Sequence, residues 1–550
     1  VQGMIERLDY LQALGIDALW ISPPYPSPQI DCGYDVADYT DIAPEYGTLE
    51  EFEVFLAEAH KRGIRVILDL VLNHTSDQHP WFQASKTSRD DPKRDWYVWR
   101  DGKIGPDGER LLPNNWEASF TGSAWEYDPA TDQYYYHFFL KEQPDLNWRN
   151  PEVKQAMWDA VRFWLDKGVD GFRLDAIGTI FEDEALPDQE SGMTLLGLYQ
   201  AWESAKTSEE IEALEGTWEE LFVHQVNRPG LHPLLKELRQ VVDEYEDRML
   251  IGEEDGIAYY GNGDDELHMV FNFPLMRIEG PLTPAHIRKN QAERLGALPE
   301  GAWPCNTLGN HDSPRVKSRF GASVLPQRNG EHDDALARLS LALMLTLRGT
   351  PFLYYGEEIG MTNRAFESLD QLQDTLALRR YEIATGAGMP EAQATALVCA
   401  GTRDRCRTPM QWADAPNAGF SPEGVTPWLP VHSNHAEGVN VADQEDDPDA
   451  MLNFYRRMLA VRKRTPALIA GEYTPLLSDH EACLCFLRTT EAQTCLVALN
   501  FSAEAQLISF EGEGLMAEEL IFSSNAARSD AGEVAALELA PFEIYIASVQ

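Results

Sequence analysis

The order of apolar and amphipathic segments constrains the fold of this 550-residue chain more than any other feature. Short runs rich in β-branched and other apolar residues alternate with stretches in which apolar residues recur three and four positions apart. This order predicts parallel strands joined by crossover helices. The expected strands are DALWISPP from Asp17, RVILDLVLNH from Arg65, GFRLDA from Gly171, MLIGEE from Met249, LHMVFNFPL from Leu267, NTLGNHD from Asn306 and TPFLYYGEE from Thr350. Seven such strands are one short of a (β/α)₈ TIM barrel.

Two of the intervening segments have a clear helical pattern. Residues 49–63 and 150–168 carry apolar residues at helical spacing, and each segment ends at a glycine. Glycine is a common residue just beyond the end of a helix. We therefore expect both segments to be helices that cover the predicted sheet.

Three segments depart from this alternation of strand-like and helix-like patterns. Residues 75–142 are rich in Trp, Tyr, Pro, Asn and Asp, which indicates an inserted subdomain. The acidic stretch from Glu182 to Glu220 has helical character and is interpreted as a solvated excursion. Short strand-like runs in residues 468–550 predict a C-terminal β-sandwich domain. Residues 1–74 and 143–467 then form the barrel.

The charge balance excludes several classes of partner. The chain has 90 Asp and Glu residues against 45 Lys and Arg, a formal net charge of −45. Such a surface repels nucleic acid and anionic membranes and favours neutral or cationic partners. It is compatible with salt adaptation and equally with plain solubility. No run approaches the roughly 18 apolar residues of a membrane helix, and no export signal is visible, so we expect a soluble protein.

The cysteine pattern favours a reducing compartment. Seven cysteines, an odd number, occur at irregular intervals without a CxxC pair. Reduced thiols in a cytoplasm fit this pattern best. Cys483 and Cys485 alternate within an apolar run, which predicts two side chains on one strand face and no zinc site.

Acidic residues follow three of the expected strands. Asp175, Glu253 and Asp312 lie at carboxyl ends, which converge on the active-site face of a barrel. A single carboxylate at a strand end is usually a cap or a surface acid, but three are harder to dismiss. Arg173 lies two positions before Asp175, so it can hold that carboxylate ionised. The apolar run before Glu253 favours a raised pKa and a proton donor, whereas Glu254 should face the opposite way.

Histidines and aromatic residues suggest sugar contacts. His74 and His311 each end an expected strand beside an Asn, where a neutral imidazole can donate to a sugar hydroxyl. A core histidine bonded to the backbone is an equally good interpretation of either one. Most of the aromatic rings belong in the core, but their faces also suit sugar C–H groups. They are Tyr34, Trp81, Trp96, Trp99, Trp116, Trp125 and the run YYYHFF that ends at Phe139.

Several other catalytic motifs are absent from the sequence. There is no GxxxxGK[ST] phosphate loop and no GxGxxG between a strand and a helix. There is also no GxSxG nucleophile elbow and no HExxH zinc helix. These absences argue against nucleotide-dependent, serine-hydrolase and zinc-peptidase chemistry.

Four motifs together resemble the signature blocks of glycoside hydrolase family 13, the α-amylase family. They are DLVLNH (Asp69 to His74), GFRLDA (Gly171 to Ala176), the pair Gly252–Glu253 and GNHD (Gly309 to Asp312). The resemblance runs nearly end to end and is closest to the bacterial oligosaccharide α-glucosidases. QPDLNW from Gln143, RTPMQW from Arg407 and DCGYD from Asp31 resemble the same branch, which includes oligo-1,6-glucosidase-like and maltase-like members.

The resemblance implies a retaining, exo-acting α-glucosidase. By position, Asp175 is the nucleophile, Glu253 is the general acid and base, and Asp312 grips hydroxyls of the distorted sugar. Asp31 and Arg403 resemble the pair that closes the far end of the pocket, which implies action on chain ends of short oligosaccharides. The substrate-binding residues implied are Asp31, Tyr34, His74, Phe139, Arg173, His311 and Arg403.

Linkage preference and reaction type leave alternatives open. The residue after the nucleophile tends to be Val in α-1,6-preferring relatives and is Ala176 here, which favours maltose over isomaltose. A glucosyltransferase or isomerase, such as trehalose synthase or sucrose isomerase, uses the same covalent intermediate. Ancillary transporter subunits share the fold but lack the carboxylates and carry a membrane helix, so they fit the sequence poorly.

The start of the chain departs from the family pattern. Family members open with an aromatic-rich first strand and an Asp/Gly-rich metal-binding loop, whereas this sequence starts at VQGMIERLDYLQALGIDALW. We therefore expect a barrel that lacks its first strand and has two unpaired strand edges. The calcium site of that loop cannot be carried over, so we expect no metal and no cofactor.

Overall fold

The computed structural model describes residues 1–120, 122–204, 208–278, 281–320 and 332–550. The chain divides into two compact units. The first unit comprises Val1–Gln12, Ile16–Val270 and Asp374–Ala394, and the second comprises Ala13–Gly15, Phe271–Gln373 and Thr395–Gln550. The three domains expected from the sequence stay a prediction, because this division follows compactness and does not test their boundaries.

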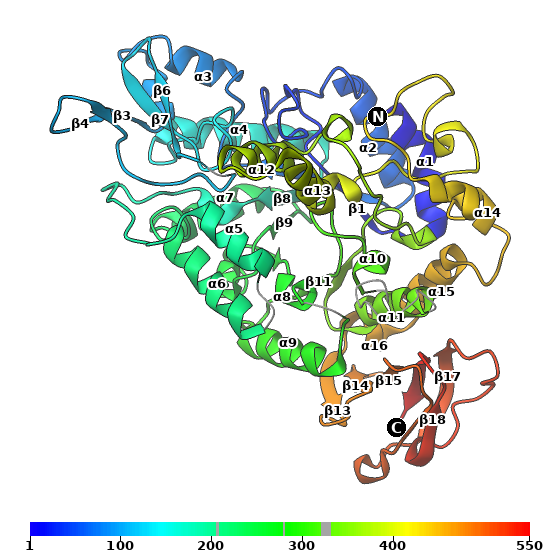
Figure 1. The fold of residues 1–550 in the computed structure, drawn as a ribbon. Coiled ribbons are helices and arrows are strands. Elements are labelled where there is room, and N and C mark those ends of the chain that lie inside the picture. The colour runs from blue at the N-terminus through cyan, green and yellow to red at the C-terminus, as the bar shows by residue number, and fades with distance from the viewer. Residues whose placement is uncertain (121, 205–207, 279–280, 321–331) are drawn as a thin grey trace. The chain divides into compact units, whose positions relative to one another are not determined.

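A five-stranded parallel sheet forms the centre of the first unit (Figure 1). All five strands expected in this part of the chain are present. The last is only two residues long, because helix α8 (Phe273–Met276) begins three residues later with Pro274 in its first turn. In spatial order the strands are β1 (Ala18–Ile21), β2 (Arg65–Val71), β8 (Gly171–Asp175), β9 (Met249–Gly252) and β10 (Met269–Val270).

Helices α2 (Leu49–Lys61) and α4 (Pro151–Lys167) confirm the two helical predictions. Thr48 and Glu51 form a capping box at the start of α2. Asn150 caps α4, whose following residue Gly168 has φ +102°, a left-handed conformation that glycine adopts without strain. This unit also contains most of α1 (Gln2–Leu14), together with α7 (Leu231–Val242) and α12 (Thr375–Gly386).

A small antiparallel sheet and two acidic helices share one apolar cluster in the first unit. Leu195 and Leu198 of α5 (Leu195–Ser204) and Leu221 of α6 (Ser208–Leu221) are buried in it. The acidic stretch is therefore not solvated on every face as expected, because Leu195 and Leu198 pack in a cluster with the aromatic rings of the sheet. The sheet consists of β3 (Trp99–Arg100), β7 (Gln133–Tyr136) and β6 (Trp125–Asp128), and it is flanked by α3 (Pro80–Ser85) and the hairpin β4 (Lys103–Ile104) with β5 (Arg110–Leu111).

The second unit contains the two remaining parallel strands. β11 (Cys305–Thr307) pairs with β12 (Thr350–Phe352), and Thr307 lies opposite Phe352. Both strands were expected from the sequence. Its helices include α9 (Pro284–Ala297), α10 (Val316–Phe320), α11 (Asp333–Thr346), most of α13 (Glu391–Gly401), α15 (Met451–Arg464) and α16 (Pro466–Ala470). Among the described residues of the whole chain, no helix has the length and apolarity needed to cross a bilayer.

The end of the second unit is built entirely of antiparallel strands. Cys483 and Cys485 belong to one buried apolar cluster, which confirms that they share a strand face. All seven cysteines of the chain are free thiols. One sheet has the order β13 (Glu472–Leu476), β14 (Cys483–Thr489), β15 (Thr494–Asn500), β19 (Ile544–Val549) and β17 (Ala517–Ser523), and a second sheet pairs β16 (Gln506–Ile508) with β18 (Leu537–Leu539).

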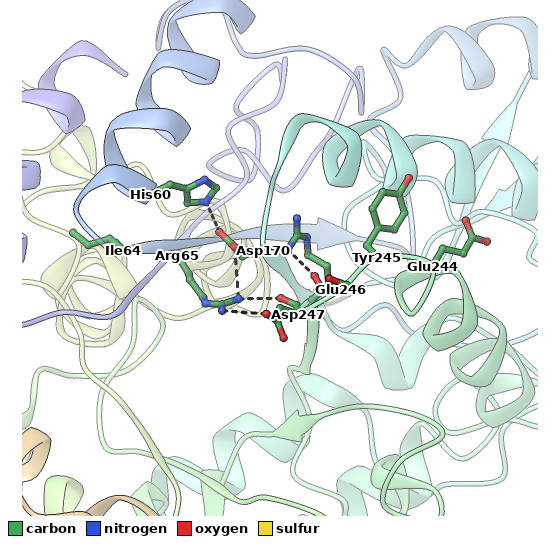
Figure 2. Close-up of a pocket in the computed structure, with 10 residues that line it drawn as sticks. His60, Ile64, Arg65, Asp170, Glu244, Tyr245, Glu246 and Asp247 are labelled. Carbon is green, nitrogen blue, oxygen red and sulfur yellow. Dashed lines mark hydrogen bonds and ion pairs between the residues drawn. The ribbon is translucent and has the colours of Figure 1, made fainter.

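An ion-pair network lines an open surface pocket of about 850 Å³ at the amino ends of β2, β8 and β9 (Figure 2). The buried carboxylate of Asp170 accepts the Val66 N–H at 2.8 Å and lies 2.7 Å from His60 Nε2. The guanidinium groups of Arg65 and Arg248 lie 3.8 Å and 4.0 Å from the same carboxylate. Since these contacts join the starts of three strands, the network belongs to the stability of the sheet.

An Asp170→Ala variant is expected to lower the free energy of unfolding by about 1 to 3 kcal/mol. The reason is that the buried Val66 N–H would lose its acceptor and two arginines would lose a neighbouring carboxylate. Urea denaturation of the variant and the natural chain measures the difference. Equal unfolding free energies would contradict this role for Asp170.

Candidate active site

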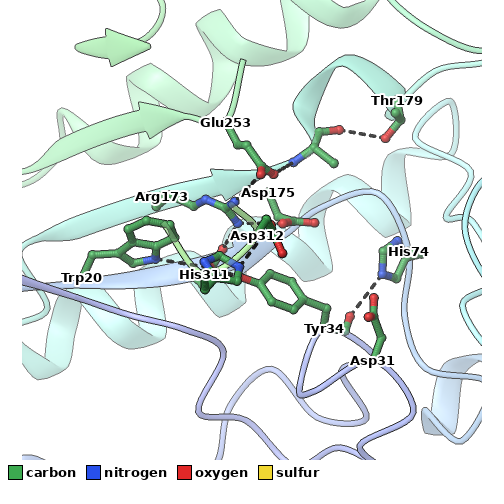
Figure 3. Close-up of polar contacts among 12 residues, drawn as sticks. Trp20, Asp31, Tyr34, His74, Arg173, Asp175, Thr179, Glu253, His311 and Asp312 are labelled. Atoms are coloured by element: carbon green, nitrogen blue, oxygen red, sulfur yellow. Dashed lines mark hydrogen bonds and ion pairs between the residues drawn. The ribbon is translucent and has the colours of Figure 1, made fainter. Parts of the chain in front are cut away.

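A single buried arginine lies at the centre of the carboxylates in the first unit. Arg173 is only 1% exposed, and its Nη1 atom lies 2.8 Å from Asp69 Oδ1 and 2.6 Å from Asp175 Oδ1. Its Nη2 atom lies 2.7 Å from Glu253 Oε1 (Figure 3). One guanidinium thus contacts three carboxylates from the neighbouring strands β2 and β8 and from the end of β9.

Strand register explains this convergence. Asp69 lies directly opposite Arg173 in the β2–β8 pair. Asp175 follows Arg173 by two positions, so both side chains project from the same face of β8. The contact between Arg173 and Asp175 that the spacing predicts is therefore present. Asp69 was not identified from the sequence as a functional residue, although an acid inside an otherwise apolar strand was an available signal.

Two aromatic side chains fix the other oxygen of Asp69. Trp20 donates its indole N–H to Asp69 Oδ2 at 3.1 Å, and Tyr34 donates its hydroxyl to the same oxygen at 2.9 Å. Asp69 is fully buried, so these bonds and the Arg173 contact replace its hydration. The Tyr34 ring, a predicted stacking platform, is thereby held beside the carboxylate cluster.

Burial changes the proton affinity of the cluster. It raises the pKa of Asp69 to about 6 and the pKa of Asp175 to about 7, against the opposing charge of Arg173. The expectation that Arg173 holds Asp175 ionised therefore omitted the larger effect, which is desolvation by burial. The charge of Asp69 raises the pKa of Asp175 further, and Glu253 acts in the opposite direction.

The loop after Asp175 lies tightly against the residues that follow β9. The N–H of Ala176 donates to Glu253 Oε2 at 3.0 Å, and Ala176 adopts φ +41°, in the left-handed region. A Cβ atom at Gly178 would lie 2.2 Å from a carboxylate oxygen of Glu254. Glu254 therefore packs on this loop, while Glu253 contacts Arg173.

A second group of predicted residues forms one network in the first unit. Gln143 donates its side-chain amide to Asp31 Oδ2 at 3.0 Å, and the same amide nitrogen lies 3.0 Å from His74 Nε2. The ring of Phe139 meets the His74 imidazole edge to face, with centroids 5.2 Å apart. Gln143 belongs to the recognised QPDLNW motif but was not singled out from the sequence.

His74 has the surroundings of a core histidine. It is fully buried, and its Nε2 atom lies 3.1 Å from the carbonyl of Tyr34 (Figure 3). Burial lowers the pKa of His74 to about 4, so the imidazole is neutral at neutral pH. A role for this ring in binding a sugar hydroxyl stays a prediction.

The second unit holds the remaining candidates. Asp312 Oδ1 lies 3.3 Å from Arg403 Nη1 and 2.5 Å from Arg407 Nη2, and Asp312 Oδ2 lies 3.4 Å from His311 Nε2. Arg407 also donates its Nε–H to the His311 carbonyl at 2.8 Å. Arg407 begins the RTPMQW motif, yet its contact with Asp312 is not apparent from a separation of 95 residues.

The predicted site residues thus form separate groups in the two units. Asp175, Glu253, Arg173 and Tyr34 share one group, and Asp31, His74 and Phe139 share another in the same unit. His311, Asp312 and Arg403 are together in the second unit. Convergence of Asp312 with Asp175, and the pairing of Asp31 with Arg403, would join the two units and stay predictions.

Across the part of the chain that the structure describes, no three or more His, Cys, Asp and Glu side chains are grouped so that they could hold a metal ion. The expectation of a site without metal or cofactor stays a prediction.

Comparisons with known proteins agree with the sequence motifs. The family model "Alpha amylase, catalytic domain" matches residues 1–471, and "Maltogenic Amylase, C-terminal domain" matches residues 473–546. An oligo-1,6-glucosidase of Halalkalibacterium halodurans is 37% identical over 99% of this chain and 93% of its own length. A probable alpha-glucosidase of Rhizobium meliloti is 39% identical over 94% of this chain and 90% of its own length.

Solved structures extend the likeness to three dimensions. The trehalulose synthase of Pseudomonas mesoacidophila MX-45 matches with a TM-score of 0.85 and 36% identity, over 100% of this chain and 95% of that one. The TIM-barrel fold and the C-terminal all-β domain expected from the sequence are thereby confirmed. The chain belongs to the α-amylase family of glycoside hydrolases and is a glycoside hydrolase.

Proposed function

We propose that the chain is a retaining, exo-acting α-glucosidase that releases glucose from the non-reducing end of maltose and short α-glucosides. Asp175 is the nucleophile, Glu253 is the general acid and base, and Asp312 holds sugar hydroxyls. The observation that carries the proposal is the buried guanidinium of Arg173, which contacts Asp175 and Glu253 together. Asp31, Tyr34, His74, Phe139, His311 and Arg403 complete the proposed sugar pocket.

The reaction proceeds by double displacement. Glu253 donates its proton to the glycosidic oxygen while an oxygen of Asp175 attacks the anomeric carbon, which forms a β-linked glucosyl ester and frees the leaving sugar. Glu253 then takes a proton from water, whose oxygen attacks the same carbon and releases Asp175. Two inversions leave glucose in the α configuration.

The geometry of the two carboxyl groups supports this mechanism over single displacement. Inverting enzymes separate their carboxyls by roughly 6.5 to 9.5 Å, which leaves room for a water molecule between one carboxylate and the sugar. Asp175 Oδ1 and Glu253 Oε1 lie 2.6 Å and 2.7 Å from the two terminal nitrogens of the same guanidinium, that of Arg173. Such proximity suits direct attack by Asp175 on the anomeric carbon.

Charge and thiol chemistry support a neutral substrate and a reducing compartment. The net charge of −45 disfavours anionic ligands, so a neutral oligosaccharide fits better than a phosphorylated one. We propose a cytoplasmic location, because all seven cysteines are free thiols. Nucleic acid and membranes are not expected partners.

A second candidate is glucosyl transfer or isomerisation. The likeness to a trehalulose synthase favours it, since that enzyme class can use the same glucosyl-enzyme with a sugar as acceptor. Incubation with maltose, isomaltose, sucrose and trehalose, followed by chromatography of all products, separates the two. Free glucose as the main product from maltose supports hydrolysis, whereas rearranged disaccharides from sucrose or maltose would replace it with isomerase activity.

An Ala176→Val variant is expected to raise the ratio of isomaltose to maltose hydrolysis, in kcat/KM, by about tenfold, because one pocket contact typically changes discrimination by that order. The variant should also lose about 1 to 2 kcal/mol of unfolding free energy. The left-handed backbone at Ala176, with φ +41° and ψ +43°, is unfavourable for a β-branched residue. An Ala176→Ser variant, which is not β-branched, is the matched control. An unchanged ratio in Ala176→Val would contradict the inference that Ala176 sets linkage preference.

The pH profile of kcat/KM provides a test of the carboxylate cluster. Asp175 attacks only when ionised, and burial raises its pKa to about 7, so activity should rise with pH up to about that value. The charge of Asp69 adds to this raised pKa. Asp69→Asn removes that charge, so the acid limb of the profile is expected to move to lower pH. In Asp170→Asn, at the opposite end of the sheet, the limb should stay in place, and an unmoved limb in Asp69→Asn would contradict the coupling.

A further inference from the structure

Asp145, in the QPDLNW motif, lies where two parts of the pocket wall meet. It forms an isolated antiparallel bridge with His74, just beyond the end of β2. Its N–H donates to the Tyr136 carbonyl at 3.2 Å, at the end of β7. The backbone of Asp145 therefore joins the segment that carries His74 to the segment that carries Phe139.

The side chain of Asp145 makes the same connection with its carboxyl group. Its Oδ1 atom accepts the Phe138 N–H at 2.9 Å, one residue before Phe139. The Asn73 side chain also favours the charged form of this carboxyl, and Asn73 Nδ2 lies 3.2 Å from His74 Nδ1. One buried carboxyl thus reaches the imidazole of His74 through Asn73 and the ring of Phe139 through the backbone.

The chemistry of this position suits a neutral acid. Asp145 is only 3% exposed, and burial raises its pKa well above the usual range. The nearby charge of Glu182 acts in the same direction, while the hydrogen bond from Phe138 and the Asn73 side chain oppose it. A protonated carboxyl can remain buried without an ion-pair partner, and its shape is matched by the amide of asparagine.

We propose that Asp145 is a positioning residue that fixes the separation of His74 and Phe139 and thereby sets the affinity of the pocket for the terminal sugar. Its contribution is to substrate binding and not to bond cleavage, because its contacts are with the pocket wall and not with Asp175 or Glu253. This inference rests on the proposed function, since it assigns a role within the same site.

Steady-state kinetics with p-nitrophenyl α-glucoside and maltose test the proposal in the full chain. Asp145→Ala removes the acceptor of the Phe138 N–H and is expected to raise KM about tenfold, with kcat changed less than twofold. Asp145→Asn keeps an acceptor at the same place and should stay within about twofold of the natural KM. Asn73→Ala removes the side chain between Asp145 and His74 and leaves the buried carboxyl in place. This variant should also raise KM, and it provides the test if Asp145→Ala fails to fold.

Asp170→Ala is the matched control. It also removes a buried aspartate, but at the amino ends of β2 and β8, whereas Asp145 lies just beyond the carboxyl end of β2. It should lower stability and leave KM unchanged, which separates a general loss of stability from a change in the pocket. An unchanged KM in Asp145→Ala or Asn73→Ala, or a KM in Asp145→Asn as high as in Asp145→Ala, would overturn the proposal. If the natural chain releases no glucose from either substrate, the proposed function fails instead.

Discussion

Asp175→Asn is expected to lower kcat for glucose release by about 10⁴-fold or more, because removal of a catalytic nucleophile typically costs this much or more. The amide has the size of the carboxylate but does not form the glucosyl ester, and Arg173, 2.6 Å from Asp175, loses one of its anionic partners. Release of p-nitrophenol from p-nitrophenyl α-glucoside measures the effect. Circular dichroism of the variant establishes that it is folded.

Azide separates the roles of Asp175 and Glu253. In Asp175→Gly, azide can attack the sugar directly in the space left by the carboxylate, and β-glucosyl azide is expected. In Glu253→Ala, azide instead attacks the glucosyl ester on Asp175, and α-glucosyl azide is expected. Residual kcat above about 1% in Asp175→Asn, or the same azide anomer from both variants, would contradict the assignment of nucleophile and acid.

Arg173→Met is expected to lower the free energy of unfolding by about 3 to 5 kcal/mol at pH 8, and to abolish activity. The variant leaves three carboxylates without the buried cation they contact at 2.6 to 2.8 Å. The loss should be smaller at pH 5. Asp69 and Asp175 have raised pKa values, about 6 and 7, so their stability contribution is most favourable at low pH and declines as pH rises through these values.

Guanidinium chloride unfolding at pH 5 and pH 8 measures both losses. Arg173→Lys is the matched control, because it keeps the positive charge but not the planar fork that reaches three carboxylates. Its loss of stability should lie between those of the natural chain and Arg173→Met. An equal loss in Arg173→Met at both pH values would show that the carboxylates do not titrate as one cluster.

The strand order was predictable because each parallel strand is a short apolar run with its own turn and helix signals. Prediction was weaker where two signals compete. LHMVFNFPL from Leu267 is apolar enough for a long strand, but Pro274 fits the first turn of a helix and ends the strand at Val270. Leu195 and Leu198 lie near acidic residues, so net charge concealed the apolar face that they bury.

The acids of the site were predictable because they end strands in recognisable motifs, whereas their partners were not. Asp69 faces Arg173 across the β2–β8 register, over 104 residues of sequence. Gln143 reaches Asp31 over 112 residues. Such contacts depend on the register of neighbouring strands and loops, which local sequence does not reveal. Burial raises the pKa of Asp175 and the charge of Arg173 lowers it, and which effect is larger likewise depends on the three-dimensional structure.

Proton NMR of the first minutes of p-nitrophenyl α-glucoside hydrolysis tests the central claim most directly, because the glucosyl unit is the only sugar released and its anomeric proton is observed before mutarotation equilibrates the anomers. Double displacement by Asp175 and Glu253 predicts that α-glucose appears first, and that Asp175→Asn produces neither anomer. Initial appearance of β-glucose, or glucose release that persists in Asp175→Asn, would contradict the mechanism proposed for this site.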